Sequence, residues 1–173
     1  AFITRSLAKK VLTDIDDIES SFLAGLMHDV GILVLDNVIP REYYQFLTLK
    51  DLSSSDKPLE LLEEEEFKIS HPEVGAEFIK KWWSPPPKVA SGALAHHGKG
   101  PVKGETLTLN QIVSTANRIA NLNKFNHPVS TAFEDSPEEG YLDALQISQE
   151  DLNIVVDTTK IGLMEAETLL RSQ

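Results

Sequence analysis

The sequence predicts an all-α protein folded as a helical bundle, and three observations support this. Apolar residues recur at three- and four-residue spacings along most of the 173-residue chain, and this is the period of one helix face. Capping sequences and prolines stand where such stretches begin. No segment shows the apolar and polar alternation that predicts a half-buried strand, and we find no internal repeat.

A core helix is expected between residues 18 and 35. Its apolar side chains fall on one stripe at helical spacing, namely Phe22, Leu26, Val30 and Leu33. Asp36, Asn37 and Pro40 are expected to end it. Upstream, the apolar pattern is already under way at Phe2 without a methionine or a capping residue. We therefore expect the chain to lack an N-terminal part.

Three helices are expected in the middle of the chain. The first carries leucines followed by an acidic run, residues 63 to 66, which we expect to be solvated. Ser70 and Glu73 then form a capping-box sequence, in which the serine and the glutamate satisfy free amides at a helix start. Prolines at 85 to 87 end that helix and open the next.

Two adjacent tryptophans, Trp82 and Trp83, lie at the end of the capped helix. Because neighbouring residues of a helix cannot face the same way, we expect one ring in the core and the other near the surface. An exposed tryptophan would be a candidate contact for a partner protein.

The C-terminal part is expected to add three helices. The first is marked by Leu109, Ile112, Ala116 and Ile119. A short helix is expected to start at Ser136, and a long one is capped by residues 148 to 151. The long helix carries apolar or small residues at helical spacing, namely Leu152, Val155, Val156, Thr159, Leu163, Ala166 and Leu170. We expect one domain, with a core over residues 1–125 on which the helices of residues 126–173 pack.

Composition excludes several functional classes. The chain has no cysteine, so disulfides, iron–sulfur clusters and thiolate metal sites are excluded, and any metal must be held by nitrogen and oxygen. A net charge of −11 disfavours binding to nucleic acid or to an anionic membrane surface. The sequence shows neither a secretion signal nor a membrane span of about 20 apolar residues, so we expect a cytoplasmic protein.

Four of the five histidines fall into three clusters: His28 beside Asp29, His71, and His96 beside His97. Imidazole and carboxylate ligands suit iron, manganese, zinc or nickel. Three glycines are expected to leave room for a pocket near these clusters, namely Gly25, Gly31 and Gly92. Taken one by one, histidines of this kind are more often hydrogen-bonded structural groups than ligands, so both interpretations stay open. His127 receives only the structural one.

The order and spacing of these motifs resemble the HDOD family. The resemblance rests on the segment from Phe22 to Gly31 (FLAGLMHDVG), on Ser70 to Ala76 (SHPEVGA), on the tryptophans before Pro85, and on the His96–His97 pair. HDOD domains are HD-related output domains of bacterial signalling proteins. They are relatives of the HD metal-dependent phosphohydrolases and of the HD-GYP cyclic-di-GMP phosphodiesterases. The resemblance implies an HD-domain-like helical bundle with a central pocket.

Carried over residue by residue, the resemblance implies a metal site made of five residues. His28 and Asp29 match the HD pair that binds metal in the catalytic relatives, and His71, His96 and His97 match the histidines that complete a two-metal site in the HD-GYP branch. The resemblance thus implies a divalent ion as cofactor, with one ion favoured over two.

The chain also departs from the catalytic relatives. No histidine precedes the HD pair, and Asn117 stands where a closing aspartate is expected, so that ligand position is degenerate. Ile32 replaces a lysine that can contact phosphate in the HD-GYP enzymes, and the sequence from Gly98 to Pro101 does not reproduce the Gly-Tyr-Pro signature. These departures weaken the case for an enzyme.

Two functions therefore remain. The first, which we favour, is a non-catalytic signalling or regulatory module that engages other signalling domains or proteins. The second is a metal-dependent phosphohydrolase or phosphodiesterase acting on a nucleotide or cyclic dinucleotide. A third possibility is a sensor that binds a nucleotide without cleaving it. Residues 80 to 104 hold five lysines and no acid, so Lys99 and Lys103 are weak candidates for anion binding.

Overall fold

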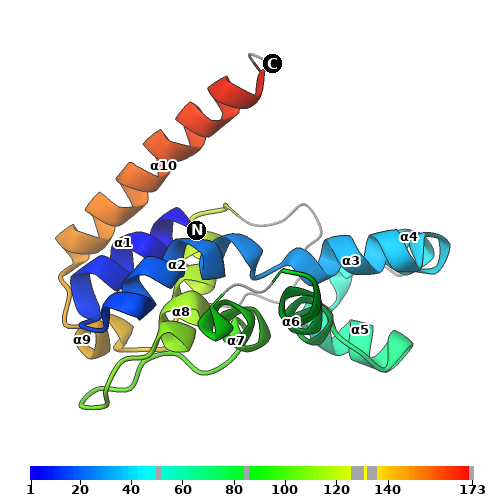
Figure 1. Ribbon diagram of the computed structural model, residues 1–173, viewed down its shortest axis with the longest axis horizontal. Coiled ribbons are helices and arrows are strands. Elements are labelled where there is room, and N and C mark those ends of the chain that lie inside the picture. Colours follow the sequence, from blue (N-terminus) through cyan, green and yellow to red (C-terminus); the bar gives the residue numbers. More distant parts are fainter. Residues whose placement is uncertain (50–51, 84–85, 126–130, 132–135, 172–173) are drawn as a thin grey trace.

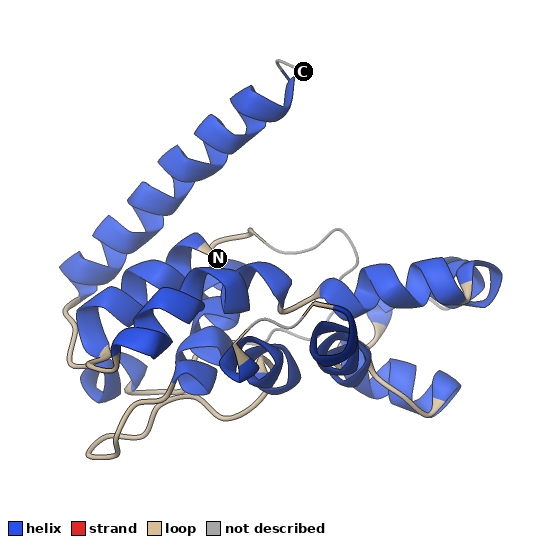
Figure 2. Cartoon of the chain, viewed as in Figure 1, coloured by secondary structure: helices blue, strands red, loops and turns tan. Residues whose placement is uncertain are grey.

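The computed structural model describes residues 1–173 except 50–51, 84–85, 126–130, 132–135 and 172–173 (Figure 1). The described residues form helices and loops, with no strand among them (Figure 2). The prediction of an all-α helical bundle is confirmed. In chain order the elements are α1 Phe2–Val11, α2 Ile15–Met27, α3 Val30–Val38, α4 Pro40–Leu49, the 3-10 helix η1 Leu52–Ser54, α5 Leu59–Phe67, α6 His71–Trp82, α7 Pro87–Ala95, α8 Leu109–Leu122, α9 Tyr141–Leu145 and α10 Gln149–Arg171.

The core is divided into a main bundle and an arm. In the main bundle, α1, α2, α8, α9 and α10 share one apolar cluster, which includes Leu7, Ala24, Ile112, Leu145 and Val155. In the arm, α3, α4, η1 and α5 share a second cluster, which includes Ile32, Leu35, Tyr43, Phe46 and Leu62. Helices α6 and α7 lie between the two and share a third cluster with α2 and the start of α3 (Figure 1).

The helix expected over residues 18 to 35 is in fact two helices. Helix α2 ends at Met27 and α3 begins at Val30, so the break falls at His28 and Asp29. Apolar spacing continues on both sides of the break, and the pattern alone therefore does not reveal it. At the break, His28 Nδ1 lies 3.0 Å from the carbonyl oxygen of Gly25 and occupies an acceptor of the last turn of α2.

The segment Ile15–Val38 is long and apolar enough, by length and composition, to cross a membrane. The structure nevertheless divides it between α2 and α3, and 44% of its most apolar window is buried inside the protein. We interpret it as a core segment of a helical domain, in which apolar helices cover one another. The cytoplasmic location stays a prediction.

Of the three helix starts expected at a serine, two are confirmed. The backbone N–H of Ser70 donates to Glu73 Oε2 over 2.9 Å at the start of α6. The backbone N–H of Ser148 donates to Asp151 Oδ2 over 3.1 Å at the start of α10. The expected helix at Ser136 is wrong, because α9 begins only at Tyr141.

The reason for the late start of α9 lies in a tertiary contact made by Glu138. Its Oε1 accepts a hydrogen bond from the backbone N–H of Gly100 over 2.7 Å and lies 3.3 Å from Arg118 Nη1. Glu138 would suit the first turn of a helix, but here it binds the loop that follows α7.

Helix α10 is covered along its first half only. Leu152, Val155 and Val156 are buried against the main bundle, and Thr159 is also buried. Beyond Gly162, which still approaches the Phe2 ring of α1, the helix extends away from the other helices (Figure 1), and Met164 and Leu169 are 69% and 68% exposed. Leu163 is 37% exposed, and the side chain of Leu170 lies outside those described.

Both tryptophans are exposed, Trp82 by 70% and Trp83 by 51%, so the expectation of one buried ring is wrong. Helix α6 ends at Trp82, and Trp83 follows as a C-cap with φ −127°. The helical rotation that would carry one ring inward therefore stops between them. Lys81 Nζ lies 5.5 Å from the centroid of the Trp82 ring.

We expect Trp82→Ala to change the free energy of unfolding by less than about 0.5 kcal/mol, because little apolar surface leaves the core. Ile79→Ala on the same helix removes a fully buried side chain and should cost about 2–5 kcal/mol. Urea unfolding of the two variants checks this. A cost for Trp82→Ala close to that of Ile79→Ala would mean that the ring is covered.

Candidate metal centre

The histidine clusters and Asp29 converge where the main bundle meets the arm. Asp29 lies at the break between α2 and α3, His71 is the first residue of α6, and His96 and His97 follow the last residue of α7. Each side chain therefore stands at a helix end. One ligand atom from each of these four residues lies within 4.8 Å of the other three.

The closest contacts of the cluster join imidazole nitrogens. Nε2 of His71 lies 3.2 Å from Nε2 of His96 and 3.2 Å from Nε2 of His97. Asp29 Oδ1 lies 3.2 Å from His96 Nε2 and 3.7 Å from His71 Nε2. His71 and His96 are buried, whereas the Asp29 and His97 side chains are 31% and 23% exposed.

The partners of the opposite ring nitrogens fix the tautomers of His71 and His96. Nδ1 of His71 lies 2.6 Å from Glu63 Oε2, and Nδ1 of His96 lies 2.6 Å from the carbonyl oxygen of Ala93. A carbonyl and a carboxylate that already accepts other bonds are acceptors only, so we infer that both Nδ1 atoms carry the proton. Both Nε2 atoms then present lone pairs to each other, which repel unless a cation or a shared proton lies between them.

Glu63 is a functional residue that the sequence interpretation missed. The acidic run of residues 63 to 66 was expected to be solvated, yet Glu63 is fully buried. Its Oε2 accepts from the backbone N–H of His71 over 2.7 Å as well as from Nδ1, and its Oε1 accepts from the Tyr43 hydroxyl over 2.6 Å. A carboxylate behind a histidine orients the ring and makes it a stronger metal ligand.

A signal for Glu63 was present in the helical register. Residues 59, 62 and 67 form the apolar face of α5, and position 63 falls on that face because it follows position 59 by one turn. Burial, together with the negative charge of Glu63, raises the pKa of Tyr43 well above its usual value. The Tyr43 hydroxyl therefore stays protonated and remains a donor to Glu63.

His28 lies on the outer side of Asp29. Its Nε2 is 3.0 Å from Asp29 Oδ2, the oxygen that does not face the other histidines. Burial opposes ionisation of Asp29, but His28 and His96 outweigh it and hold the pKa of this carboxyl well below its usual range. Burial lowers the pKa of His96 to about 3. A charged carboxylate beside a neutral imidazole is the protonation state that a metal requires.

The space beside Gly31 and Gly92 is filled by neighbouring elements, which corrects the expectation of a pocket there, whereas Gly25 lines the cavity described next. A Cβ added at Gly31 would lie 1.9 Å from the carbonyl oxygen of His71, and one at Gly25 would lie 2.3 Å from Thr4 Oγ1. At Gly92 it would meet Ala24 Cβ at 3.2 Å. These glycines let helices approach closely, and Gly31 brings the starts of α3 and α6 together.

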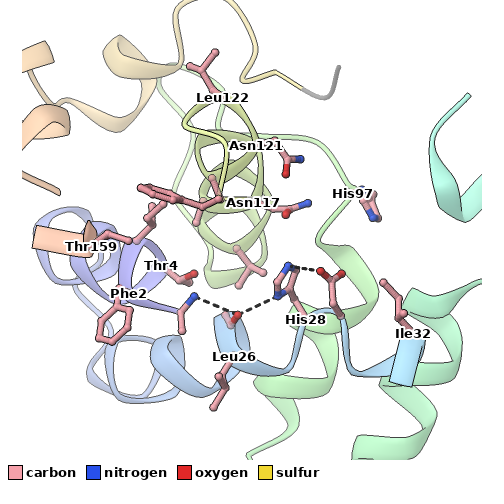
Figure 3. Close-up of a pocket in the computed structure, with 18 of the residues that line it drawn as sticks. Phe2, Thr4, Leu26, His28, Ile32, His97, Asn117, Asn121, Leu122 and Thr159 are labelled. Carbon is pink, nitrogen blue, oxygen red and sulfur yellow. Dashed lines mark hydrogen bonds and ion pairs between the residues drawn. The ribbon is translucent and has the colours of Figure 1, made fainter. Parts of the chain in front are cut away.

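A cavity of about 900 Å³ adjoins the cluster (Figure 3). His28, Asp29, His71 and His97 line one end of it, and residues of α1, α2, α8, α10 and the start of α5 are among those that line the rest. Asn117 and Asn121 project into it from α8 on the side toward His97 (Figure 3). Ile32 also lines the cavity. A space of this size accommodates a small organic ligand.

The family model of the HDOD domain matches residues 1–98, more than half of the chain. The chain belongs to the HDOD family. The match spans all four residues of the converging cluster, and their positions agree with the resemblance noted in the sequence. No curated protein and no solved structure matches the chain.

The residues of this HDOD domain fit a metal ion. Asp29, His71, His96 and His97 offer one carboxylate and three imidazole atoms around a common point, and Glu63 supplies the outer carboxylate. A further observation supports the fit. Glu60 Oε2 is buried without a hydrogen-bond partner and lies 3.6 Å from His97 Nε2.

The remaining predicted site residues of the HDOD domain are not part of the His/Asp group. Asn117 lines the cavity. Lys99 and Lys103 are exposed and are not among the described residues that line the cavity, and Lys103 Nζ lies 3.5 Å from Asp143. Their role in anion binding stays a prediction. His127 lies outside the described residues.

Proposed function

We propose that this HDOD domain is a non-catalytic signalling module whose pocket holds a single divalent ion. The observation that carries the proposal is the 3.2 Å distance between Nε2 of His71 and Nε2 of His96 beside Asp29, where the inferred tautomers make two lone pairs face each other. One cation between them removes the repulsion. The ion would join helix ends from α3, α6 and α7 and thereby organise the fold.

The ligand set favours one ion over a catalytic pair. Hydrolysis of a phosphodiester by two metals needs ions about 3.5–4 Å apart, each with its own ligands. The four ligand atoms here gather within 4.8 Å of one another. Asn117 is neutral, so it supplies no anionic contact for a second ion.

The output of such a module is delivered through contacts with other signalling proteins. The exposed pair of Trp82 and Trp83 is the surface we assign to this role. Tryptophan is enriched among the residues that dominate binding energy at protein interfaces. Two exposed rings side by side at a helix end would supply apolar contact area for a partner.

The second candidate is a phosphohydrolase or a sensor acting on a nucleotide or cyclic dinucleotide. The specific observation in its favour is the cavity of about 900 Å³ beside the cluster. Asn117 and Asn121 offer amide donors and acceptors within it, so a nucleotide could be bound with its phosphate near the histidines.

Metal analysis combined with a turnover assay distinguishes the two. We expect freshly purified protein to bind close to one equivalent of iron, manganese, zinc or nickel. We also expect no hydrolysis of bis(p-nitrophenyl) phosphate or cyclic-di-GMP. Two equivalents with turnover that His28→Ala abolishes would establish the enzyme instead. Calorimetric binding of cyclic-di-GMP without product would identify a sensor.

A further inference from the structure

Glu60 carries an unexplained feature of the site. Its side chain is 19% exposed, but its Oε2 is buried and has no hydrogen-bond partner. His97 Nε2 lies 3.6 Å from this oxygen, which is too far for a hydrogen bond. Burial of a carboxylate oxygen without a donor is costly, so the position calls for a positive partner.

Helix α5 presents two carboxylates to the cluster from one face. Glu60 and Glu63 are three residues apart, and residues at this spacing are neighbours on a helix surface. Glu63 stands behind His71 and bonds its Nδ1, whereas Glu60 faces His97 on the ligand side. The next residue, Glu64, is exposed.

The two carboxylates belong to a different part of the fold from His97. Helix α5 packs through Leu59, Leu62 and Phe67 on the apolar cluster of the arm. His97 follows α7, whose buried residues Val89, Ala90 and Ala93 belong to the cluster between arm and bundle. A contact between Glu60 and the cluster therefore joins α5 to the end of α7.

We propose that Glu60 is an additional ligand, recruited by the bound ion, and that ion binding thereby fastens the first turn of α5 to the cluster. The inference rests on the proposed function, since it requires an ion in the pocket. A carboxylate oxygen is a suitable ligand for the same metals as the imidazoles. Occupancy of the pocket would then be transmitted to the arm through α5.

The first turn of α5 lies beside the cavity. The amides of Leu61 and Leu62 both donate to the carbonyl oxygen of Pro58, and Pro58 lines the cavity. Glu60 stands in this first turn. Without a ligand bond from Glu60, the turn depends on its own backbone bonds and on the 3.6 Å approach to His97.

The test compares Glu60→Gln with Glu64→Gln, a matched change on the exposed side of the same helix. Zn²⁺ affinity is measured by competition with a chromophoric chelator, and the visible spectrum is recorded with Co²⁺ as the only metal. We expect Glu60→Gln to weaken Zn²⁺ binding by about tenfold to a hundredfold, as for other losses around a metal centre, and to alter the Co²⁺ spectrum. Glu64→Gln should match the wild type in both.

Hydrogen exchange and thermal unfolding supply readouts that do not depend on activity. Zn²⁺ should slow exchange at the amides of Leu61 and Leu62 in the wild type and in Glu64→Gln but not in Glu60→Gln. The metal-free Glu60→Gln protein should be at least as stable as the wild type, because a carboxylate with a buried oxygen that lacks a donor is replaced by a neutral amide. A cooperative thermal transition of metal-free Glu60→Gln at or above the wild-type temperature would show that the variant folds.

The outcomes separate this inference from the proposed function. If the wild type binds Zn²⁺ and Glu60→Gln binds it equally well with an unchanged Co²⁺ spectrum, Glu60 is not a ligand and only the present inference fails. If the wild type binds neither Zn²⁺ nor Co²⁺, the single-ion function fails and the inference fails with it.

Discussion

Glu63→Ala is expected to lower the free energy of unfolding by about 4 kcal/mol, because removing one member of a buried charged network leaves its partners unsatisfied. Three donors lose their acceptor: the Tyr43 hydroxyl and the backbone N–H and Nδ1–H of His71. For a domain of this length the midpoint of thermal unfolding should fall by roughly 10 °C. Calorimetry and urea unfolding of the metal-free protein provide the measurement.

Two further variants show whether the cause is the buried carboxylate. Glu64→Ala removes an exposed carboxylate from the same helix and should change stability by less than about 0.5 kcal/mol. Glu63→Gln keeps one oxygen that can accept a hydrogen bond, but its NH₂ group replaces the other oxygen and cannot accept one. Its loss of unfolding free energy should therefore lie between those of Glu63→Ala and Glu64→Ala. Equal stability of Glu63→Ala and Glu64→Ala would show that position 63 is solvated in solution, as the acidic run first indicated.

Metal affinity should follow the same order. His71 loses the carboxylate that fixes its tautomer in Glu63→Ala, so Zn²⁺ binding should weaken by about tenfold to a hundredfold. The exposed change at Glu64 should leave it unaltered. A fall in stability without a fall in affinity would assign Glu63 a structural role only.

Local patterns allowed most of the helices to be predicted, because their signals lie in neighbouring residues. The Ser70–Glu73 box marks the start of α6 through bonds that span three residues. The candidate metal ligands were proposed from the motif resemblance. The structure brings four of them together, namely Asp29, His71, His96 and His97. His28 joins this group only through Asp29.

Features that depend on distant residues could not be predicted in the same way. The break at His28 and Asp29 interrupts a continuous apolar pattern, and nothing local to those residues indicates it. Glu138 looks like a first-turn residue until its contacts with Gly100 and Arg118 are seen. For Glu138, contacts far along the chain outweigh the local preference of the side chain for a helix.

The acidic run shows the same limit in a single helix. Four consecutive glutamates indicate a solvated surface by composition, yet the register of α5 turns Glu63 inward and leaves Glu64 outside. A carboxylate can be buried without a large cost only where hydrogen-bond donors contact its oxygens. The donors are Tyr43 and His71, and neither is close to Glu63 in a way that the sequence reveals.

Gly31→Ala is expected to destabilise the protein by about 1–3 kcal/mol, the usual cost of overpacking a tight contact. The added Cβ would lie 1.9 Å from the carbonyl oxygen of His71 and 2.8 Å from the backbone nitrogen of Gly75. Both are backbone atoms, so α3 and α6 must move apart. Asp29 precedes α3 and His71 begins α6, so this movement separates two residues of the four-residue His/Asp group. Zn²⁺ affinity should therefore fall by roughly tenfold or more.

The matched control is Gly162→Ala in α10. There the three atoms nearest to the added Cβ all belong to the Phe2 ring, the first at 3.0 Å, and a ring can shift where a backbone cannot. Alanine also favours a helix over glycine by about 1 kcal/mol, so we expect the stability to change by less than about 1 kcal/mol. Urea unfolding and Zn²⁺ competition should therefore separate the two glycines. If Gly31→Ala binds Zn²⁺ as tightly as Gly162→Ala does, the close approach of α3 to α6 does not hold the cluster in place.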